Sequence, residues 1–421
     1  MKYVILGSSA AGVNAGRALR TLVPNLDAEI IMVSKDKTIY SRCILHHYLG
    51  EIRTIPQLNF AEHDYFDKFQ IQFIGNTEVV GLDVEQKKIL FHTGEELTYD
   101  KLLIATGASS FIPPIPFLSE ATNMVGFRNL DDIEFIKAHI QSQEAKQHVI
   151  VVGAGLVGMD AISGLLELGI KATLLDLAPY PLVKQLDEVS AQLYVQAMEY
   201  RGIQQIYSTS IDSVVYQEGT QVIERVQLSN GESLPCTLLI MAAGVRPNTS
   251  FLEHTPVELH NFGLVINSQG QTNIPDIYGA GDVSGLGPIW PIAVKEGIIA
   301  VTNMVGRQLE MADFFASKST MNFWGITTLS LGNPNLDDST YEVEILHQPD
   351  QGIYKKIVHK DGKIYGAILQ GDIDYSGILQ QLIIHKIDVS RIKKTIFDID
   401  YSDFFHINNK MEYQIQEYET F

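Results

Sequence analysis

The stretch Val149-Ile-Val-Val-Gly-Ala-Gly-Leu-Val-Gly158 decides the fold. Its first four residues are all apolar, which is typical of a parallel strand that helices cover on both faces. The glycine turn that follows leads into a helix that we expect to reach about Leu168, and residues 171–176 have the pattern of the next strand. Strand, glycine turn, helix and strand in this order predict a dinucleotide-binding βαβ unit.

The three glycines of this turn have separate roles in such a unit. Gly153 permits the tight turn, Gly155 lets backbone approach a pyrophosphate, and Gly158 lets the helix pack on the strand. Asp176 follows Gly153 by 23 residues, close to the spacing of an acid that binds a ribose 2′-hydroxyl. That carboxylate would repel a 2′-phosphate, so NADH is expected rather than NADPH. The predicted contacts are Gly153, Gly155, Leu156, Val157, Gly158 and Asp176.

A second copy of the pattern stands near the N-terminus. Tyr3-Val-Ile-Leu-Gly-Ser-Ser-Ala-Ala-Gly12 leads into a helix and then a strand at residues 29–33. Here Ser9 replaces the middle glycine of the turn. After the strand, Ser34 could bind the ribose through one hydrogen bond, or Asp36 could take the place of the usual acid. Taken alone, this turn fits a purely structural role equally well.

Beyond about residue 310 the pattern changes to short alternating strands. Asp361-Gly362 predicts a hairpin turn, and residues 376–385 have the pattern of a helix. The expected strands are residues 321–330, 341–346, 354–359 and 363–369. The sequence therefore predicts an α/β fold with two Rossmann-like dinucleotide-binding domains and a C-terminal α+β module.

The composition limits the possible partners. The chain has 421 residues with 31 basic and 50 acidic side chains, a net charge of −19. This charge repels phosphate backbones and anionic lipids, so neither nucleic acid nor a membrane is an expected partner. No apolar run approaches the roughly 18 residues of a spanning helix, and no secretory leader is recognisable. Two cysteines, Cys43 and Cys236, form no disulfide framework, and we expect a cytoplasmic protein without a metal site.

Three further motifs extend the pattern. They are Leu102-Leu-Ile-Ala-Thr-Gly-Ala108, Leu238-Leu-Ile-Met-Ala-Ala-Gly-Val-Arg-Pro-Asn248 and Thr272-Asn-Ile-Pro-Asp-Ile-Tyr-Gly-Ala-Gly-Asp282. With the two glycine turns, they resemble the pyridine nucleotide–disulfide oxidoreductase superfamily over about residues 1–310. The resemblance implies an FAD-binding domain at 1–113 and 246–312, an inserted NAD(H)-binding domain at 114–245, and a C-terminal interface domain at 313–421.

The resemblance also implies which residues contact the cofactors. The Asp282 carboxylate would bind the ribityl chain, and an acid between a strand end and a helix suits that role. Val79 matches the position where backbone meets the adenine, and Asp160 stands where many relatives carry a glutamate near the nicotinamide. Gly244 is a further expected cofactor contact. The implied FAD contacts are Gly7, Ser9, Ala10, Ala11, Gly12, Ser34, Lys35, Arg42, Val79, Ala105, Thr106, Gly107, Gly281 and Asp282.

Cys43 indicates the subgroup. It lies in Tyr40-Ser-Arg-Cys-Ile-Leu-His-His-Tyr-Leu-Gly50, and no second cysteine follows four or five positions later. A single cysteine at this position resembles the NADH oxidases, NADH peroxidases and coenzyme A–disulfide reductases, which form a sulfenate or a mixed disulfide. We expect the helix N-terminus and Arg42 to lower the pKa of the thiol. The alternative is a small buried cysteine without a redox role.

A second branch of the superfamily also matches. The Tyr-Ser-Arg stretch and residues 362–372 resemble the flavin reductases that serve rubredoxin, ferredoxin or nitrite reductase, in which Arg42 would contact the flavin and no cysteine is needed. Relatives that split peroxide carry a histidine in the first glycine turn, where this chain has Ala10 and Ala11. We expect His46 and His47 to be solvent or flavin-rim residues and Cys236 to be structural.

Three hypotheses of function remain open. In the first, electrons from NADH pass through FAD and then by way of Cys43 to a small disulfide or an oxygen species. In the second, the reduced flavin delivers electrons to a small redox protein without thiol chemistry. The third, from another class, is an NAD-binding redox sensor. For each of these we expect a homodimer that forms through the C-terminal module.

Overall fold

The computed structural model describes residues 1–24, 28–142, 148–261, 263–287, 289–311, 318–336, 338–374, 376–407, 409, 411 and 413–415. The chain forms two compact units. The first unit contains Met1–Gly153, Asp160–Ala172 and Ser210–Phe314. The second contains Ala154–Met159, Thr173–Thr209 and Phe315–Phe421.

A five-stranded parallel sheet forms the centre of the first unit. Its order is β20 (Ile277–Gly279), β7 (Lys101–Ile104), β1 (Lys2–Leu6), β2 (Glu29–Val33) and β3 (Gln72–Ile74). Leu6 of β1 is paired with Val33 and with Ile104 on its two sides. Because the strands are parallel, the turns after β1, β2, β7 and β20 all lie at one edge of the sheet.

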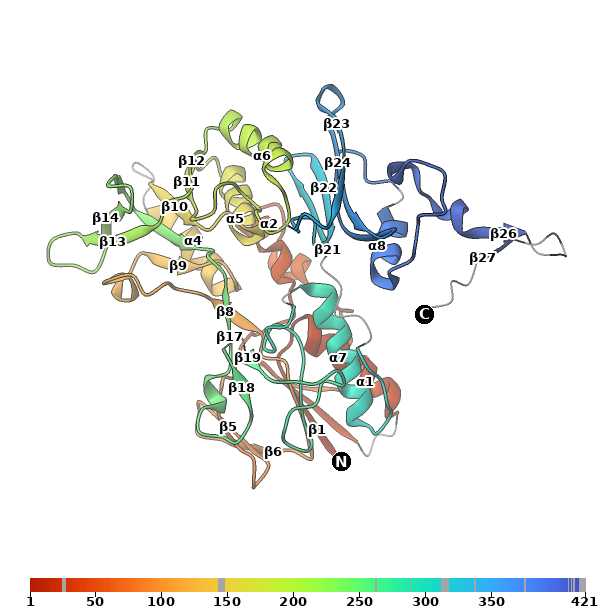
Figure 1. The fold of residues 1–421 in the computed structure, drawn as a ribbon. Coiled ribbons are helices and arrows are strands. Elements are labelled where there is room, and N and C mark those ends of the chain that lie inside the picture. Colours follow the sequence, from red (N-terminus) through yellow and green to blue (C-terminus); the bar gives the residue numbers. More distant parts are fainter. Residues whose placement is uncertain are drawn as a thin grey trace. The chain divides into compact units, whose positions relative to one another are not determined.

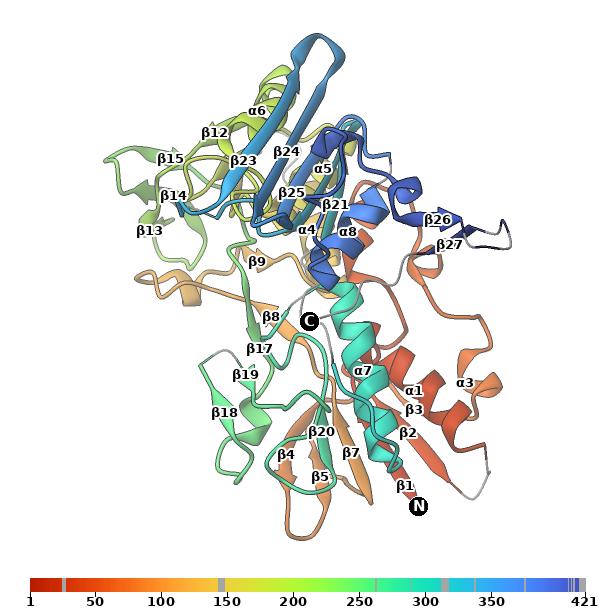
Figure 2. The same ribbon diagram turned by 45° about the vertical axis from the view of Figure 1, so that its right-hand side comes forward.

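Helices α1 (Ala10–Leu22) and α7 (Trp290–Met304) lie side by side over one face of this sheet (Figures 1 and 2). They approach closely because a glycine stands at their contact: a Cβ on Gly297 would lie 2.5 Å from the Ala11 carbonyl oxygen. At the start of α1, a Cβ on Gly12 would lie 1.9 Å from the carbonyl oxygen of Gly7 in the preceding turn. The antiparallel strands β4 (Val79–Asp83), β5 (Lys88–Phe91) and β6 (Glu96–Thr98) contribute Ile89 and Phe91 to the core on the opposite face.

The rest of the first unit contains smaller sheets and helices. Strand β16 (Leu238–Met241) pairs in parallel with β10 (Val149–Val152) and with β9 (Met124–Gly126). The antiparallel groups are β13 (Ile211–Tyr216) with β14 (Ile223–Leu228) and β15 (Ser233–Pro235), β8 (Ala108–Ser110) with β17 (Val245–Pro247), and β18 (Leu259–His260) with β19 (Gly263–Leu264). The remaining helices are α2 (Leu45–Leu49), α3 (Tyr65–Lys68), α4 (Leu130–Ser142) and α5 (Leu156–Glu167), and α5 continues from the second unit into the first.

An antiparallel sheet dominates the second unit. Its order is β21 (Lys318–Phe323), β22 (Ile326–Gly332), β25 (Lys363–Gln370), β24 (Ile353–Lys360) and β23 (Glu342–Gln348). Helix α8 (Ser376–His385) packs on it through a core that includes Leu329, Ile357 and Leu382. The unit also contains β11 (Ala172–Leu175), α6 (Glu188–Tyr200), β12 (Gln204–Ile206), β26 (Phe405–Ile407) and β27 (Tyr413–Ile415).

The α/β class with an added C-terminal sheet is confirmed, with one correction. The hairpin at Asp361-Gly362 forms as predicted, and both residues have positive φ, at 49° and 73°. The predicted single strand at residues 321–330 is wrong, because the chain reverses at Trp324 and Gly325 and forms β21 and β22. Trp324 has a φ of 55°, a conformation that a tryptophan adopts rarely, so only Gly325 gave a turn signal.

Candidate active site

A cavity of about 440 Å³ lies at the carboxyl edge of the β1 sheet. The turns after β1, β2, β7 and β20 form its walls, together with residues 128–132 and Trp290. The predicted residues that line it are Gly7, Ser9, Ala10, Ala11, Ser34, Lys35, Arg42, Cys43, Val79, Ala105, Thr106, Gly107, Gly281 and Asp282. Segments far apart in the sequence thus meet in one cavity, and Gly12 packs behind its wall.

The first glycine turn is shaped by close backbone contacts. Gly7 has a φ of 118°, and a Cβ there would lie 2.1 Å from the Ala105 oxygen, so only glycine fits. The turn brings the N-terminus of the 13-residue helix α1 to the cavity. Free N–H groups and the helix dipole make such an end suitable for a phosphate. Beside it the Ser34 hydroxyl accepts hydrogen bonds from Ser8 Oγ at 2.8 Å and from Asp36 N at 3.1 Å.

A network of charged groups crosses the cavity wall. Arg42 donates to the Asp36 carboxylate at 2.6 Å, to the Tyr40 hydroxyl at 2.8 Å and to the Arg128 carbonyl at 2.9 Å. The Arg128 guanidinium forms an ion pair with Asp282. Burial raises the pKa of Tyr40, so its phenol stays neutral while it donates to Asp36. The wall thus holds two arginines, each paired with one carboxylate.

Arg128 is a site residue that the sequence interpretation missed. It stands in Phe127-Arg-Asn-Leu-Asp-Asp132, between β9 and α4, where Asp132 accepts from the Arg128 and Asn129 backbone N–H groups. The sequence did offer one signal for Arg128, namely a basic residue directly before a helix start that Asn129 and Asp132 can cap. Its partner Asp282 lies 154 positions further along the chain, so local pattern could not connect the two.

The environment of Cys43 differs from the expectation. The residue lies in the single 3₁₀ turn Arg42–Ile44 and is part of the cavity wall. Cys43 is exposed in this wall, so the alternative of a small buried cysteine is wrong. The protein around the thiol still raises its pKa, as do the Asp160 and Asp282 carboxylates, whereas Arg128 and the Ser41 hydroxyl act in the opposite direction. The prediction that Arg42 and a helix N-terminus lower this pKa is wrong, because Arg42 is paired with Asp36 and α2 has only five residues.

His46 is not a solvent residue. Its Nδ1 lies 3.3 Å from Asp160 Oδ1, with the two side chains 16% and 22% exposed. Burial, together with the positive charges of His47, when it is protonated, and of Arg53, lowers the pKa of His46 to about 4. Burial raises the pKa of Asp160. Both groups are therefore uncharged over a range of pH, and Asp160 lies on the dinucleotide helix α5 against α2.

The second glycine turn has the predicted form. Gly153 has a φ of 108°, and a Cβ there would lie 2.4 Å from the Ala242 oxygen. The Asp176 carboxylate accepts hydrogen bonds from the backbone N–H of Ala154 and, at 2.7 Å, of Ala178, which places it at the turn. Among the described residues, no atom lies within 4 Å of a Cβ built on Gly155. Leu156, Val157 and Gly158 open helix α5.

Gly244 and Cys236 lie among backbone contacts and buried side chains of the first unit. Gly244 has a φ of 115°, and its carbonyl accepts from Phe111 N at 2.9 Å, beside the β8–β17 pair. Cys236 is buried, which raises the pKa of its thiol to about 12 and confirms the expected structural role.

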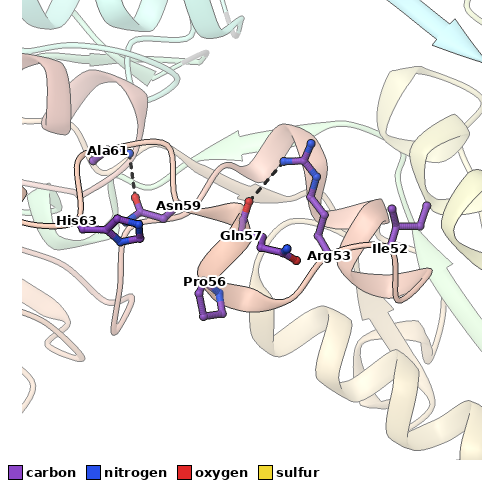
Figure 3. A pocket seen from close by; sticks show the side chains of 7 residues that line it. All are labelled: Ile52, Arg53, Pro56, Gln57, Asn59, Ala61 and His63. Atoms are coloured by element: carbon purple, nitrogen blue, oxygen red, sulfur yellow. Dashed lines mark hydrogen bonds between the residues drawn. The ribbon is translucent and has the colours of Figure 1, made fainter.

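A second pocket of about 570 Å³ lies on the segment after α2 (Figure 3). Arg53 donates to the Gln57 carbonyl at 3.4 Å, and Ala61 N donates to Asn59 Oδ1 at 2.8 Å across its rim.

Within the described ranges no three His, Cys, Asp or Glu side chains are grouped to hold a metal ion. In the same residues no helix is both long and apolar enough to cross a membrane.

Comparisons with known proteins agree with this geometry. The pyridine nucleotide-disulphide oxidoreductase family matches residues 1–297, and the rubredoxin NAD+ reductase C-terminal domain matches residues 318–387. An NADH oxidase of Methanocaldococcus jannaschii is 30% identical over 323 residues, covering 73% of this chain and 70% of that protein. The fold is similar to that of the NADH:rubredoxin oxidoreductase of Clostridium acetobutylicum, with a TM-score of 0.74, 24% identity, and coverage of 94% of this chain and 97% of that chain.

The chain also matches part of a longer protein. It is 27% identical over 398 residues to a nitrite reductase [NAD(P)H] of Bacillus subtilis, covering 93% of this chain but 48% of that protein. The chain thus spans about half the length of this relative. The family match covers well over half of the chain, and it includes both glycine turns and the Gly281-Asp282 motif. The chain therefore belongs to the pyridine nucleotide-disulphide oxidoreductase family.

Proposed function

We propose that the chain is an FAD-dependent NADH oxidoreductase that delivers electrons to a small redox protein or redox domain. The observation that carries this proposal is the cavity at the edge of the β1 sheet, which gathers nearly all the predicted FAD contacts. The family membership and the second glycine turn with its acid support the use of a nicotinamide nucleotide.

The residues of the cavity fit FAD. The turn at Gly7 and the start of α1 offer backbone N–H groups to a pyrophosphate, and Asp282 offers a carboxylate to a polyol. Ser34 and Asp36 stand at the end of β2, where a ribose would be bound. Bound FAD would accept a hydride from NADH and release the electrons to an acceptor. The protein's part is to orient the two cofactors and to exclude water between them.

Two observations favour a redox protein as the acceptor. The C-terminal module is similar to the C-terminal domain of rubredoxin NAD+ reductase. The surroundings of Cys43 raise the pKa of its thiol, which disfavours the thiolate that attacks a disulfide or a peroxide. Rubredoxin, ferredoxin or a nitrite reductase partner are the acceptors that we propose.

Reduction of a small disulfide or of oxygen species by way of Cys43 is the second candidate. Its support is the position of Cys43 in the cavity wall and the similarity to an NADH oxidase. In this case the thiol would have to lose its proton in a site that holds two nearby carboxyl groups.

The predicted domain division is part of the proposal. Strand β20 pairs with β7 in the β1 sheet, which supports one FAD-binding domain built from residues 1–113 and 246–312. Residues 114–245 would bind NADH, and 313–421 would form the C-terminal interface domain. A homodimer and a cytoplasmic location are part of the same proposal. The net charge of −19 is compatible with an aqueous compartment such as the cytoplasm.

An acceptor screen tests the function. The purified chain with FAD should be yellow, and NADH without air should bleach it; a colourless chain that takes up no FAD contradicts the enzyme. Wild type and Cys43→Ser should then reduce rubredoxin at the same rate, and neither should reduce coenzyme A disulfide quickly. A preference for the disulfide that Cys43→Ser abolishes would instead establish the second candidate.

A further inference from the structure

Residues 177–187, which connect β11 and Asp176 with α6, contact the second glycine turn; we call this segment the strap. Ala154 stands between the first two glycines of that turn, and both of its backbone groups are bound here. Its N–H donates to the Asp176 carboxylate, and its carbonyl accepts from Leu182 N at 2.8 Å. The backbone of the turn is therefore tied to the strap at the residue that follows the first glycine.

Leu182 shows that the strap needs support from its surroundings. Its side chain is 1% exposed, and its φ of 59° is a conformation that residues other than glycine adopt rarely. Such a backbone conformation persists only where neighbouring contacts hold it. The strap folds back at this point, because Gln185 N and Leu186 N both donate to the Leu182 carbonyl, at 2.8 and 2.9 Å.

The C-terminal module supplies such a contact through Asn335. The Asn335 side-chain amide donates to the Leu186 carbonyl at 2.7 Å and to the Val183 carbonyl at 3.1 Å. One amide thus binds two carbonyls on either side of the fold in the strap. Further along, Asp187 accepts from the Tyr354 hydroxyl at 2.6 Å and lies 3.2 Å from Lys356 Nζ, which ties the end of the strap to β24.

The loop that carries Asn335 is itself fixed on the C-terminal sheet. Asn333 N donates to the Tyr365 carbonyl at 3.0 Å. A Cβ on Gly366 would lie 2.3 Å from the Asn333 carbonyl oxygen and 2.5 Å from Pro334 N, so the loop backbone packs directly on β25. Asn335 is therefore presented to the strap from a rigid strand, and the strap, Ala154 and this sheet belong to the same compact unit.

We propose that the C-terminal module forms part of the NADH site, and that Asn335 is the positioning residue through which it holds the strap against the glycine turn. This inference rests on the proposed function, in which the turn and the start of α5 receive the pyrophosphate of NADH. Backbone N–H groups bind a pyrophosphate well only when they are already in place, because ordering them on binding costs affinity. By linkage, bound nucleotide should in turn hold the strap more firmly.

Hydrogen–deuterium exchange of the full chain without nucleotide tests the contact itself. Peptides that cover the strap are compared in wild type, Asn335→Ala and Asn335→Asp. The aspartate keeps the shape of the side chain, but its carboxylate cannot donate to the two carbonyls. In both variants the strap should exchange at least about tenfold faster, whereas β24 and β25 should keep their wild-type rates.

Nucleotide affinity tests the consequence. NAD+, which cannot reduce oxidised flavin, is titrated into the FAD-loaded chain by calorimetry. Its Kd should rise about tenfold in both Asn335 variants, and the KM for NADH should rise similarly with little change in kcat. Asn322→Ala is the matched control, because this asparagine is exposed on β21 of the same sheet and should leave exchange and affinity unchanged.

Three results would overturn the proposal. The first is wild-type exchange of the strap in both Asn335 variants. The second is faster exchange of the strap with an unchanged Kd for NAD+. The third is faster exchange throughout β24 and β25 as well, which would assign the effect to general destabilisation. A wild-type chain that binds no NAD+ would instead contradict the proposed function, and the exchange rates would still decide whether Asn335 holds the strap.

Discussion

The side chain of Glu296 accepts a hydrogen bond from the backbone N–H of Gly281 at 2.6 Å. Glu296 lies in α7 and is 4% exposed, and among the described residues its second carboxyl oxygen has no partner. Gly281 directly precedes Asp282 at the cavity, so Glu296 supports this turn from behind. Burial and, to a lesser extent, the Asp282 charge raise the pKa of Glu296 to about 7, although the bond from Gly281 acts against the rise.

Glu296→Gln should change how the stability of the first unit depends on pH. The wild-type carboxyl holds its proton up to about pH 7 when folded but only to about pH 4.5 when unfolded. The folded state thus binds more protons between these values, and stability falls as the pH rises through this window. The loss amounts to about 3 kcal/mol. The glutamine keeps an oxygen that can accept from Gly281 and does not ionise, so the variant should escape this loss.

Urea unfolding at pH 5 and pH 8, followed by the fluorescence of Trp290 in a Trp324→Phe background, measures the difference. Glu258→Gln, at an exposed position, is the control and should follow the wild type at both pH values. If the free energies of unfolding of Glu296→Gln and the wild type differ by the same amount at pH 5 and at pH 8, Glu296 does not titrate in this window.

Gly153→Ala and Gly155→Ala should separate folding from NADH binding. An alanine at Gly153 needs a positive φ and places its methyl 2.4 Å from the Ala242 oxygen, so stability should fall by about 1–3 kcal/mol. At Gly155 the space is open, so stability should change by less than about 0.5 kcal/mol. The same methyl would occupy the approach of a pyrophosphate, and the KM for NADH should rise at least about tenfold. Thermal unfolding and steady-state rates measure both effects, and an unchanged KM in Gly155→Ala would place NADH elsewhere.

The site residues that belong to short sequence motifs could be predicted from the sequence alone. Gly7, Gly153 and Asp282 belong to short motifs in which spacing, apolar strands and a following helix act together, and each of them lies where the motif predicts. These features depend on backbone geometry within a few residues, and for that reason a single sequence is sufficient to find them.

The features of the site that the sequence did not predict depend mostly on contacts between segments far apart in the chain. Arg42 is followed by Cys43 in the sequence, but its guanidinium turns to Asp36, which local pattern does not show. The Asp160–His46 contact arises only because Gly50 and Gly164 let two helices cross. The turn at Trp324 was missed for a local reason, because tryptophan is rare at positive φ.

Tyr354→Phe should destabilise the second unit. The Tyr354 hydroxyl, in a side chain that is 2% exposed, donates to Asp187 Oδ2 at 2.6 Å. Asp187 also caps α6 through Ser190 N at 2.9 Å and lies 3.2 Å from Lys356 Nζ. Burial acts to raise the pKa of Asp187, but these partners outweigh it and lower the pKa. Loss of a hydrogen bond to a charged group should cost about 2 kcal/mol at pH 7.

Because the pKa of Asp187 is lower in the folded state, this contribution is present above about pH 4, and it should disappear as the pH falls further. Denaturant unfolding at pH 7 and at a series of pH values from 4 down to 2 measures it. Tyr200→Phe on α6 is the control, because this tyrosine is 90% exposed and its loss should have no effect at any of these pH values. A cost for Tyr354→Phe that stays constant over the whole series from pH 7 to pH 2 would assign the effect to packing rather than to the bond with Asp187.

Substitutions at Asp176 and the next residue should change the coenzyme preference from NADH toward NADPH. The carboxylate is held at the glycine turn by the N–H groups of Ala154 and Ala178, and the next residue, Leu177, is 72% exposed. The double change Asp176→Ser with Leu177→Arg removes the group that repels a 2′-phosphate and adds a guanidinium that can bind it. The ratio of kcat/KM for NADPH to that for NADH should rise about 100-fold, which is about 2.7 kcal/mol. Leu177→Arg alone keeps the carboxylate and should shift the ratio far less. If the double variant still prefers NADH by the wild-type margin, Asp176 does not contact the ribose.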